Sequence, residues 1–195
     1  TVASGTSVVL FAGTNPTWSG TLLLNPAAGT TINLTFGTLT TAGTCGGITI
    51  AGTTTGNVSM QDNVTIGATK IVTLTSGTLT TDGVANRTHS LGLFATAPGT
   101  KTLTLGNSNI TITGTGTPWS MSNTTLTFSG ASSTITFTGA SVTFTCAQSR
   151  TFGTVNFTGG GANVFNPTTG VTLTNLTVTG TSVKTDSFKF GTVNS

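Results

Sequence analysis

The chain alternates apolar and hydroxyl-bearing residues in short units bounded by glycine, asparagine or serine. A typical unit is an apolar residue, a threonine or asparagine, and a second apolar residue. A period of two places the apolar side chains on one face of a strand and the hydroxyl groups on the other. β-Branched and aromatic residues suit such a pleated surface. The pattern predicts many short β-strands and requires no helix. The units span residues 32–36, 48–50, 64–66, 72–74, 103–105, 110–112, 126–128, 135–137, 142–144, 155–157, 171–173 and 176–178.

Internal similarity selects among the all-β architectures. Many short strands at regular spacing are typical of a sandwich, a barrel or a solenoid. Several segments recur after roughly forty residues with turns of variable length. The similar pairs are 37–43 with 77–83, 152–156 with 190–194, and 63–66 with 109–112. Stacked coils bury an apolar stripe that one coil cannot bury alone. We therefore predict an all-β fold, a parallel β-solenoid or β-helix of short strands with loose repeats of about forty residues. A β-sandwich or jelly roll is the alternative.

The chain is predicted to form a single all-β domain over residues 1–195. Residues 1–30 contain fewer alternating units and include Pro16, Trp18 and Pro26. Terminal repeats of solenoids are atypical because they cover an open end, so this segment is predicted to be an irregular cap or an interface segment. Alternation returns at Phe188 and Phe190, and an open strand there would be a docking edge. Because the chain begins at Thr1 rather than Met, we expect a processed form or part of a longer product.

Composition excludes several classes of protein. Charged residues make up 5% of the chain, against about 25% in typical domains. A helix-rich fold is excluded because good helix formers are scarce. A charge-driven disordered chain is excluded because 35% of the residues are hydrophobic. Collagen is excluded because glycine does not recur at every third residue. The six cations lie singly along the sequence and the net charge is only +3. We expect no nucleic-acid partner, which would require a dense basic patch, and no membrane insertion, because the apolar runs are strand-sized.

The two cysteines do not indicate a metal site. Cys45 and Cys146 lie far apart in the sequence, without a CxxC pair or a Cys/His cluster. In an elongated fold they would occupy different coils, beyond the reach of a disulfide. Two thiols without an internal bridge are expected, and a bridge between subunits is the alternative. No metal and no cofactor are predicted.

The titratable residues do not form a recognisable catalytic set. Asp62, Asp82 and Asp186 are far apart and lie in turn-like sequences, where aspartate side chains bond nearby main chain. His89 and Ser90 are adjacent, so in a strand they would point to opposite faces, which argues against a Ser-His-Asp triad. No catalytic residue is assigned, and the protein is predicted not to be an enzyme.

Aromatic residues are predicted to belong to the core. Most of the phenylalanines end an alternating unit, which favours a buried aromatic stack. Trp119 could stack on a sugar, but a tryptophan after a proline more often fills a corner of the core.

Thr-x-Thr pairs suggest another use of the outer surface. On a regular solenoid, outward threonines stacked every 4.7–4.9 Å form a flat lattice of hydroxyl and methyl groups, as in ice-binding solenoids. Such a surface requires one regular face, and the uneven spacing of the pairs in this sequence argues against it.

Four segments carry a resemblance to known proteins. They are NRTHSLG at 86–92, LTLGNSNITITG at 103–114, TGTPWSM at 115–121 and STITFTG at 133–139. This part of the chain resembles Thr/Gly-rich β-helix structural proteins of bacteriophages and environmental bacteria. The resemblance implies an architecture and a role in a virion or at a cell surface. It implies no catalytic residues.

These observations predict a non-enzymatic structural subunit that assembles into a larger particle or fibre. A phage virion protein, such as a capsid decoration or a tail fibre, is the first expectation. A bacterial extracellular filament subunit or adhesin and an ice-binding solenoid are the alternatives. The expected location is a virion or the extracellular cell surface. The expected partners are further copies, other structural subunits and a host-surface glycan. The physical basis is the low charge, because a soluble monomer usually carries about 25–35% charged residues on its surface.

Overall fold

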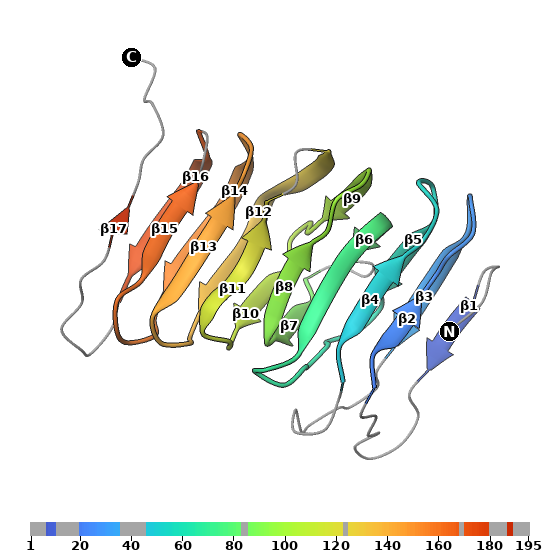
Figure 1. Cartoon of the computed structure of the whole chain (residues 1–195), viewed down its shortest axis with the longest axis horizontal. Coiled ribbons are helices and arrows are strands. Elements are labelled where there is room, and N and C mark those ends of the chain that lie inside the picture. The colour runs from blue at the N-terminus through green and yellow to red at the C-terminus, as the bar shows by residue number, and fades with distance from the viewer. Residues whose placement is uncertain are drawn as a thin grey trace.

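The computed structural model describes residues 7–10, 20–35, 46–82, 86–122, 125–167, 170–179 and 187–188. These residues form a stack of strands and turns without a helix, in a 17-stranded parallel arrangement. The chain winds into a β-solenoid of about six turns, with β1 at one end of an elongated molecule and β17 at the other (Figure 1). The predicted fold class is confirmed. The sandwich alternative is wrong, because successive coils pair in parallel along one axis.

Three parallel sheets form the sides of the coil, and β6 and β12 each contribute to two of them. The first sheet contains β2 (Leu22–Leu24), β4 (Ile48–Ala51), the start of β6 (Ile71–Thr80), β8 (Leu93–Thr96), β11 (Gly116–Met121), β13 (Val142–Cys146), β15 (Val164–Pro167) and β17 (Ser187–Phe188). The second contains β1 (Ser7–Leu10), β3 (Thr31–Thr35), β5 (Asn57–Met60), the end of β6, β9 (Lys101–Thr104) and the start of β12 (Leu126–Phe137). The third contains β7 (Thr88–Leu91), β10 (Asn109–Ile112), the end of β12, β14 (Thr151–Phe157) and β16 (Thr172–Val178).

The structural repeat is shorter than the similarity in the sequence. Ile135 pairs with Val155 and Leu24 with Ile50, so a coil takes between 20 and 26 residues. The similar segments 63–66 and 109–112 lie on the same side of the solenoid two coils apart, because Thr65 pairs with Ser90 and Ser90 with Thr111. The repeat of about forty residues therefore corresponds to two coils. Of the other similar pairs, residues 37–43 and 190–194 lie wholly outside the described residues.

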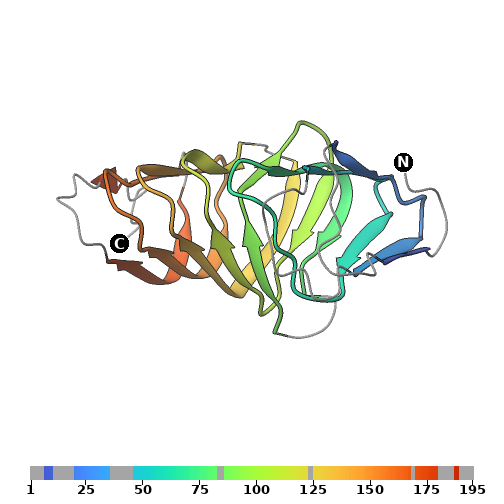
Figure 2. The ribbon, with the colours of Figure 1, turned by 90° about the horizontal axis from the view of Figure 1, so that it is seen from below.

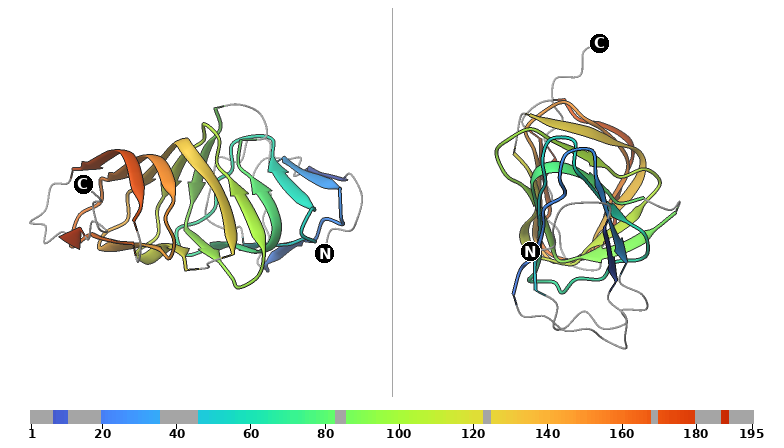
Figure 3. Two further views of the ribbon diagram at one scale, coloured as in Figure 1. Left: turned by 90° about the horizontal axis from the view of Figure 1, so that it is seen from above. Right: turned by 90° about the vertical axis from the view of Figure 1, so that its right-hand side faces the viewer.

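The interior is a continuous apolar core. In most strands from β2 to β15 alternate residues are buried, as the period of two predicts. Viewed along the axis, the coils enclose one common interior (Figure 3). Trp119 is completely buried, with its ring 4.6 Å from that of Phe94 on the previous coil. Phe137 stacks on Phe157 at 5.0 Å, and Phe144 on Phe165 at 4.9 Å. The prediction that Trp119 and the phenylalanines serve the core is confirmed for these residues.

Among the described residues, the second sheet ends before the other two. Its last strand is the start of β12, whereas the first and third sheets continue to β17 and β16. The later coils are correspondingly short, as the 20-residue step from Ile135 to Val155 indicates. Seen from below, the strands of successive coils remain aligned through this change (Figure 2). Turns, together with register shifts at β6, β11 and β12, therefore absorb the differences in coil length.

The predicted N-terminal cap lies partly in the described chain. β1 and β2 fall within residues 1–30 and pair in register with β3 and β4. These two segments are rungs of the solenoid. Residues 1–6 and 11–19, including Pro16 and Trp18, lie outside the described residues. The role of the segment as a cap or interface stays a prediction.

Candidate functional site

His89 is completely buried inside the coil, and both of its ring nitrogens have main-chain partners. Nδ1 accepts a hydrogen bond from the Val64 amide at 3.2 Å, and Nε2 donates to the Thr81 carbonyl at 2.7 Å. Burial lowers the pKa of His89. Ser90 is half-buried on the other face of the strand, as predicted. This arrangement holds a neutral imidazole as part of the core and leaves neither nitrogen available to a substrate.

Two of the three aspartates lie near His89. The charges of Asp62 and Asp82 both act to raise the pKa of His89, although burial outweighs them. Asp82 Oδ2 accepts a hydrogen bond from the Asn107 amide at 3.0 Å, so this carboxylate holds the turn of the next coil rather than its own turn. Asp186, the third aspartate, lies outside the described residues. The spacing of Asp82 and His89, seven residues apart across a predicted turn, allowed these two to pair, but the sequence did not predict that Asp62 also lies near His89.

Cys146 is a core residue of β13. Its side chain is 1% exposed, and Sγ donates to the Gln148 carbonyl at 3.3 Å. Burial raises the pKa of this thiol, which disfavours the reactive thiolate. Cys45, the other cysteine, lies outside the described residues.

We expect Cys146 to resist alkylation in the folded protein. Its labelling by iodoacetamide should be about a hundredfold slower than in denaturant, which corresponds to a local opening that costs about 3 kcal/mol. Mass spectrometry of the peptide that contains Cys146 measures both rates. Equal rates in the two conditions would show that this thiol is exposed.

The charged residues in the part of the chain that the structure describes are buried or half-buried. Lys101 and Arg150 are only 1% and 8% exposed. Lys101 Nζ donates to the carbonyls of Ala97 and Gly99, and burial lowers the pKa of this amine. The other described charged residues, Asp62, Lys70, Asp82 and Arg87, are half-buried. None of these six charged residues is fully exposed.

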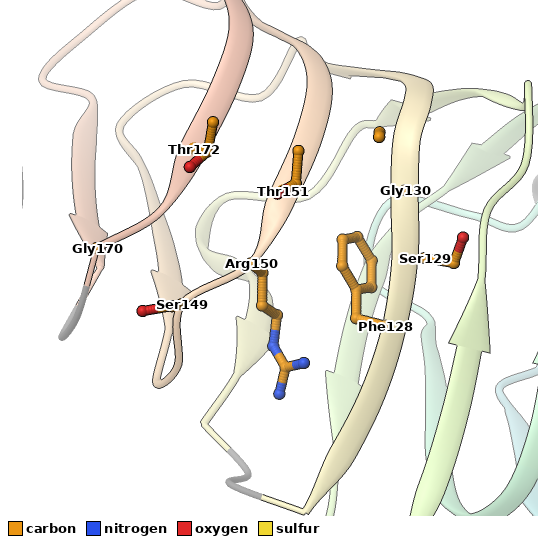
Figure 4. A pocket seen from close by; sticks show the side chains of 9 residues that line it. Phe128, Ser129, Gly130, Ser149, Arg150, Thr151, Gly170 and Thr172 are labelled. Atoms are coloured by element: carbon orange, nitrogen blue, oxygen red, sulfur yellow. The ribbon is translucent and has the colours of Figure 1, made fainter.

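A groove of about 410 Å³ lies where the second sheet ends. Phe128 and Arg150 line it, together with the hydroxyl groups of Ser149, Thr151 and Thr172 (Figure 4). The Arg150 guanidinium donates to the Leu126 carbonyl at 2.7 Å and to Gln148 Oε1 at 3.0 Å, and it lies 5.9 Å from the centre of the Phe128 ring. Arg150 thus bonds the edge of β12 where no described strand continues the second sheet. A small polar molecule would meet hydroxyl groups and one aromatic edge in this groove.

The outer face of the third sheet is a lattice of small polar side chains. Threonine, asparagine or serine occupies every outward position of three columns that run along the axis. The first column is Thr88, Asn109, Thr134, Thr154 and Asn175; the second is Thr65, Ser90, Thr111, Thr136, Asn156 and Thr177; the third is Thr113, Thr138, Thr158 and Thr179. No charged residue lies in these columns. We call them the threonine face.

The outward side chains of the first and second sheets differ from those of the threonine face. The second sheet carries two similar columns, one from Thr31 to Thr127 and one from Asn33 to Ser129. The first sheet is more apolar, because Ile71 pairs with Leu93 on the next coil, and Val164 lies further along the same sheet. Ile71 is 38% exposed and is the one large apolar side chain that is exposed among the described residues. We call the outward residues Ile71 and Leu93, with Ala95 beside Leu93 on the same strand, the apolar face.

A column of glycines marks the corner between the third and first sheets. Gly67, Gly92, Gly114, Gly139 and Gly159 follow one another on successive coils. A Cβ on Gly139 would lie 1.9 Å from the Gly114 carbonyl oxygen, and one on Gly159 would lie 1.9 Å from that of Gly139. The main chains therefore stack too closely at this corner for any side chain. Sequence reasoning missed this column, although the recurrence of glycine just after each apolar unit of the third sheet could have revealed it.

Clusters of metal-ligating side chains can be assessed only among the described residues. No group of three or more His, Cys, Asp or Glu side chains is placed to hold a metal ion in this part of the chain. Within the same residues, no helix has the length and apolar character needed to cross a membrane.

Comparison of the chain with protein-family models, with curated proteins and with solved structures finds no match in any of the three.

Proposed function

We propose that this protein is a non-enzymatic structural subunit that assembles with further copies of itself into a larger particle or fibre. The observation that carries the proposal is the distribution of charge. None of the described charged side chains is fully exposed, so neighbouring copies would meet with little electrostatic repulsion. Most soluble proteins avoid such a surface because charge opposes association.

The apolar face of the first sheet is the proposed contact between copies. Ile71 and Leu93 are register partners on adjacent coils, and small residues such as Ala95 lie beside them. A second copy that presents the same face would bury Ile71 and Leu93 against their counterparts. This is the self-complementary contact of a two-fold interface, and it would form a dimer that serves as the building block of the larger assembly. Burial of these side chains would contribute at about 25 cal/mol per Å² of apolar surface.

Within this class of function we propose a phage virion protein, a capsid decoration or a tail fibre, on the basis of the sequence resemblance. A bacterial extracellular filament subunit or an adhesin would use the same uncharged, stacked architecture. The proposed location is accordingly a virion or a cell surface. A host-surface glycan is a further proposed partner, and the groove beside Phe128 supports it, because hydroxyl groups and an aromatic edge meet there. Trp119 is buried and does not take part.

Light scattering during size-exclusion chromatography tests the assembly. The wild-type chain is expected to run as an oligomer whose mass rises with concentration. Ile71→Lys should shift it to the monomer, because a lysine ammonium at the centre of the contact would lose its water on association. Thr127→Lys is the matched control, since Thr127 is exposed on the outer face of the second sheet, and it should assemble as the wild type does.

A wild-type protein that stays monomeric at high concentration would contradict the proposed function. Equal loss of assembly in both lysine variants would show instead that added charge, rather than the apolar face, controls association.

A further inference from the structure

The threonine face has a regularity that assembly through the first sheet does not explain. Its first column keeps strict register over five coils, from Thr88 through Asn109, Thr134 and Thr154 to Asn175. The coils between these residues differ in length, yet the register partner on each successive coil is a small polar residue. The turns absorb the differences, so the uneven spacing in the sequence does not disturb this face. The expectation that uneven spacing argues against one regular outer face is therefore wrong for the third sheet.

Hydrogen bonds fix the side chains of the face in repeated orientations. In the third column, Oγ1 of Thr113 donates to the Leu91 carbonyl and Oγ1 of Thr158 donates to the Phe137 carbonyl, at 3.2 and 3.1 Å. In the other columns, Asn156 Nδ2 donates to Thr136 Oγ1 and Asn175 Nδ2 donates to Thr154 Oγ1, at 3.3 and 3.4 Å. Each bond joins one coil to the previous coil. The hydroxyl and methyl groups are thereby held as a fixed lattice rather than as freely rotating side chains.

The spacing of the lattice follows from strand geometry. Neighbouring strands lie about 4.8 Å apart along the axis, and alternate residues of one strand lie about 6.6 Å apart across it. Each hydroxyl can hold a water molecule, and waters bridged between fixed groups take the spacing of those groups. Methyl groups between the hydroxyls restrict the orientation of neighbouring water without competing for its hydrogen bonds. Charged groups would impose their own hydration shells, and none lies in the columns.

We propose that the threonine face binds water in its crystalline form, the surface of an ice crystal. A rigid, uncharged lattice that orders a water layer is complementary to a solid whose oxygens repeat at fixed distances. Liquid water has no persistent repeat of this kind, so the lattice has no matching surface to bind in the liquid. The third sheet is favoured over the second because it has three columns instead of two. The first sheet is excluded because its outward side chains are mixed in size and partly apolar. This inference does not depend on the proposed assembly, which uses a different face.

Thermal hysteresis, the gap between the melting and freezing points of a small ice crystal in the protein solution, tests the inference. The full chain is expected to open such a gap and to shape the crystal. Thr111→Tyr should abolish the gap, because the phenol ring would project from the centre of the second column and separate the face from the crystal. Thr102→Tyr is the matched control. Thr102 occupies an equivalent half-buried position on the second sheet, and this variant should keep the full gap.

The result that would overturn the inference is the absence of hysteresis in the wild type, or an equal loss in the two tyrosine variants. Circular dichroism verifies that each variant is folded. If Thr111→Tyr fails to fold, Thr138→Tyr replaces it, because Thr138 is exposed on the third column, and the same loss is expected. Ile71→Lys should retain hysteresis. Failure of assembly and failure of ice binding are therefore separate outcomes.

Discussion

Replacing Gly139 with alanine is expected to lower the free energy of unfolding by about 3 kcal/mol, at the upper end of the usual cost of overpacking. The added Cβ would lie 1.9 Å from the Gly114 carbonyl oxygen, well inside van der Waals contact. The Gly114 main chain cannot move away freely, because its amide donates to the Gly92 carbonyl at 2.9 Å. The clash must therefore spread through the stacked corners of neighbouring coils.

Urea denaturation followed by circular dichroism measures this change. Gly20→Ala is the control, since a Cβ at Gly20 would meet nothing within 4 Å. The control should change stability by no more than about 0.5 kcal/mol, as expected for an open surface position. Equal stability of the wild type and Gly139→Ala would mean that the corner is looser than its main-chain distances indicate.

The glycine column also shows why the coil length was not evident from the sequence. Gly92, Gly114 and Gly139 each follow an apolar unit of the third sheet, and one coil separates each from the next. The steps are unequal because turns of different length intervene. A search for a constant period therefore found only the similarity at about forty residues, which spans two coils. An alignment of the sequence on these glycines, rather than a search for a fixed period, would have shown the number of residues in each coil.

The sequence predicted the strands well because their determinants are local. A period of two identifies the inward side of each strand wherever the apolar units occur, and this placed Trp119 in the core and put His89 and Ser90 on opposite faces. Lys101 and Arg150 show the limit of this reasoning. Their burial depends on carbonyl oxygens supplied by a loop and by the edge of β12, and no local pattern indicates those partners.

The threonine face was predictable in composition but not in geometry. Thr-x-Thr pairs are visible along the chain, yet the columns exist only because Asn109 pairs with Thr134 and Thr134 with Thr154. Register between coils is a long-range property, set by how much chain each turn absorbs. The shortening of the coils after β12 changes the second sheet and leaves the third sheet intact. One chain can therefore carry an irregular side and a regular side together.

Stability is expected to fall as the pH drops below about 6.5, and His89 is the cause. It is the single histidine of the chain, and the carboxyl groups are limited to three aspartates, so His89 is the one side chain expected to titrate between about pH 5 and pH 7. Burial lowers its pKa in the folded protein. A proton on Nδ1 would also replace the acceptor of the Val64 amide with a second donor.

The direction of the effect follows from proton binding by the two states. Below about pH 6.5 the unfolded chain takes up a proton at His89, while the folded chain resists it. The unfolded state then binds more protons, so the free energy of unfolding decreases as the pH falls, by at most about 1.4 kcal/mol per pH unit. Below the folded-state pKa of His89 both states bind the proton, so the free energy of unfolding no longer decreases with pH through this group. The nearby charges of Asp62 and Asp82 limit the loss and that of Arg87 increases it.

Urea denaturation at a series of pH values from about 7.5 to 5 measures this dependence. His89→Gln is the informative variant, because glutamine can donate and accept hydrogen bonds but does not titrate in this range. It should be less stable than the wild type at neutral pH, since its amide cannot reproduce both main-chain contacts of the imidazole. Its stability should nevertheless stay nearly constant as the pH falls. A wild-type profile as flat as that of the variant would mean that the imidazole accepts a proton within the fold, and that the contact with Val64 is readily broken.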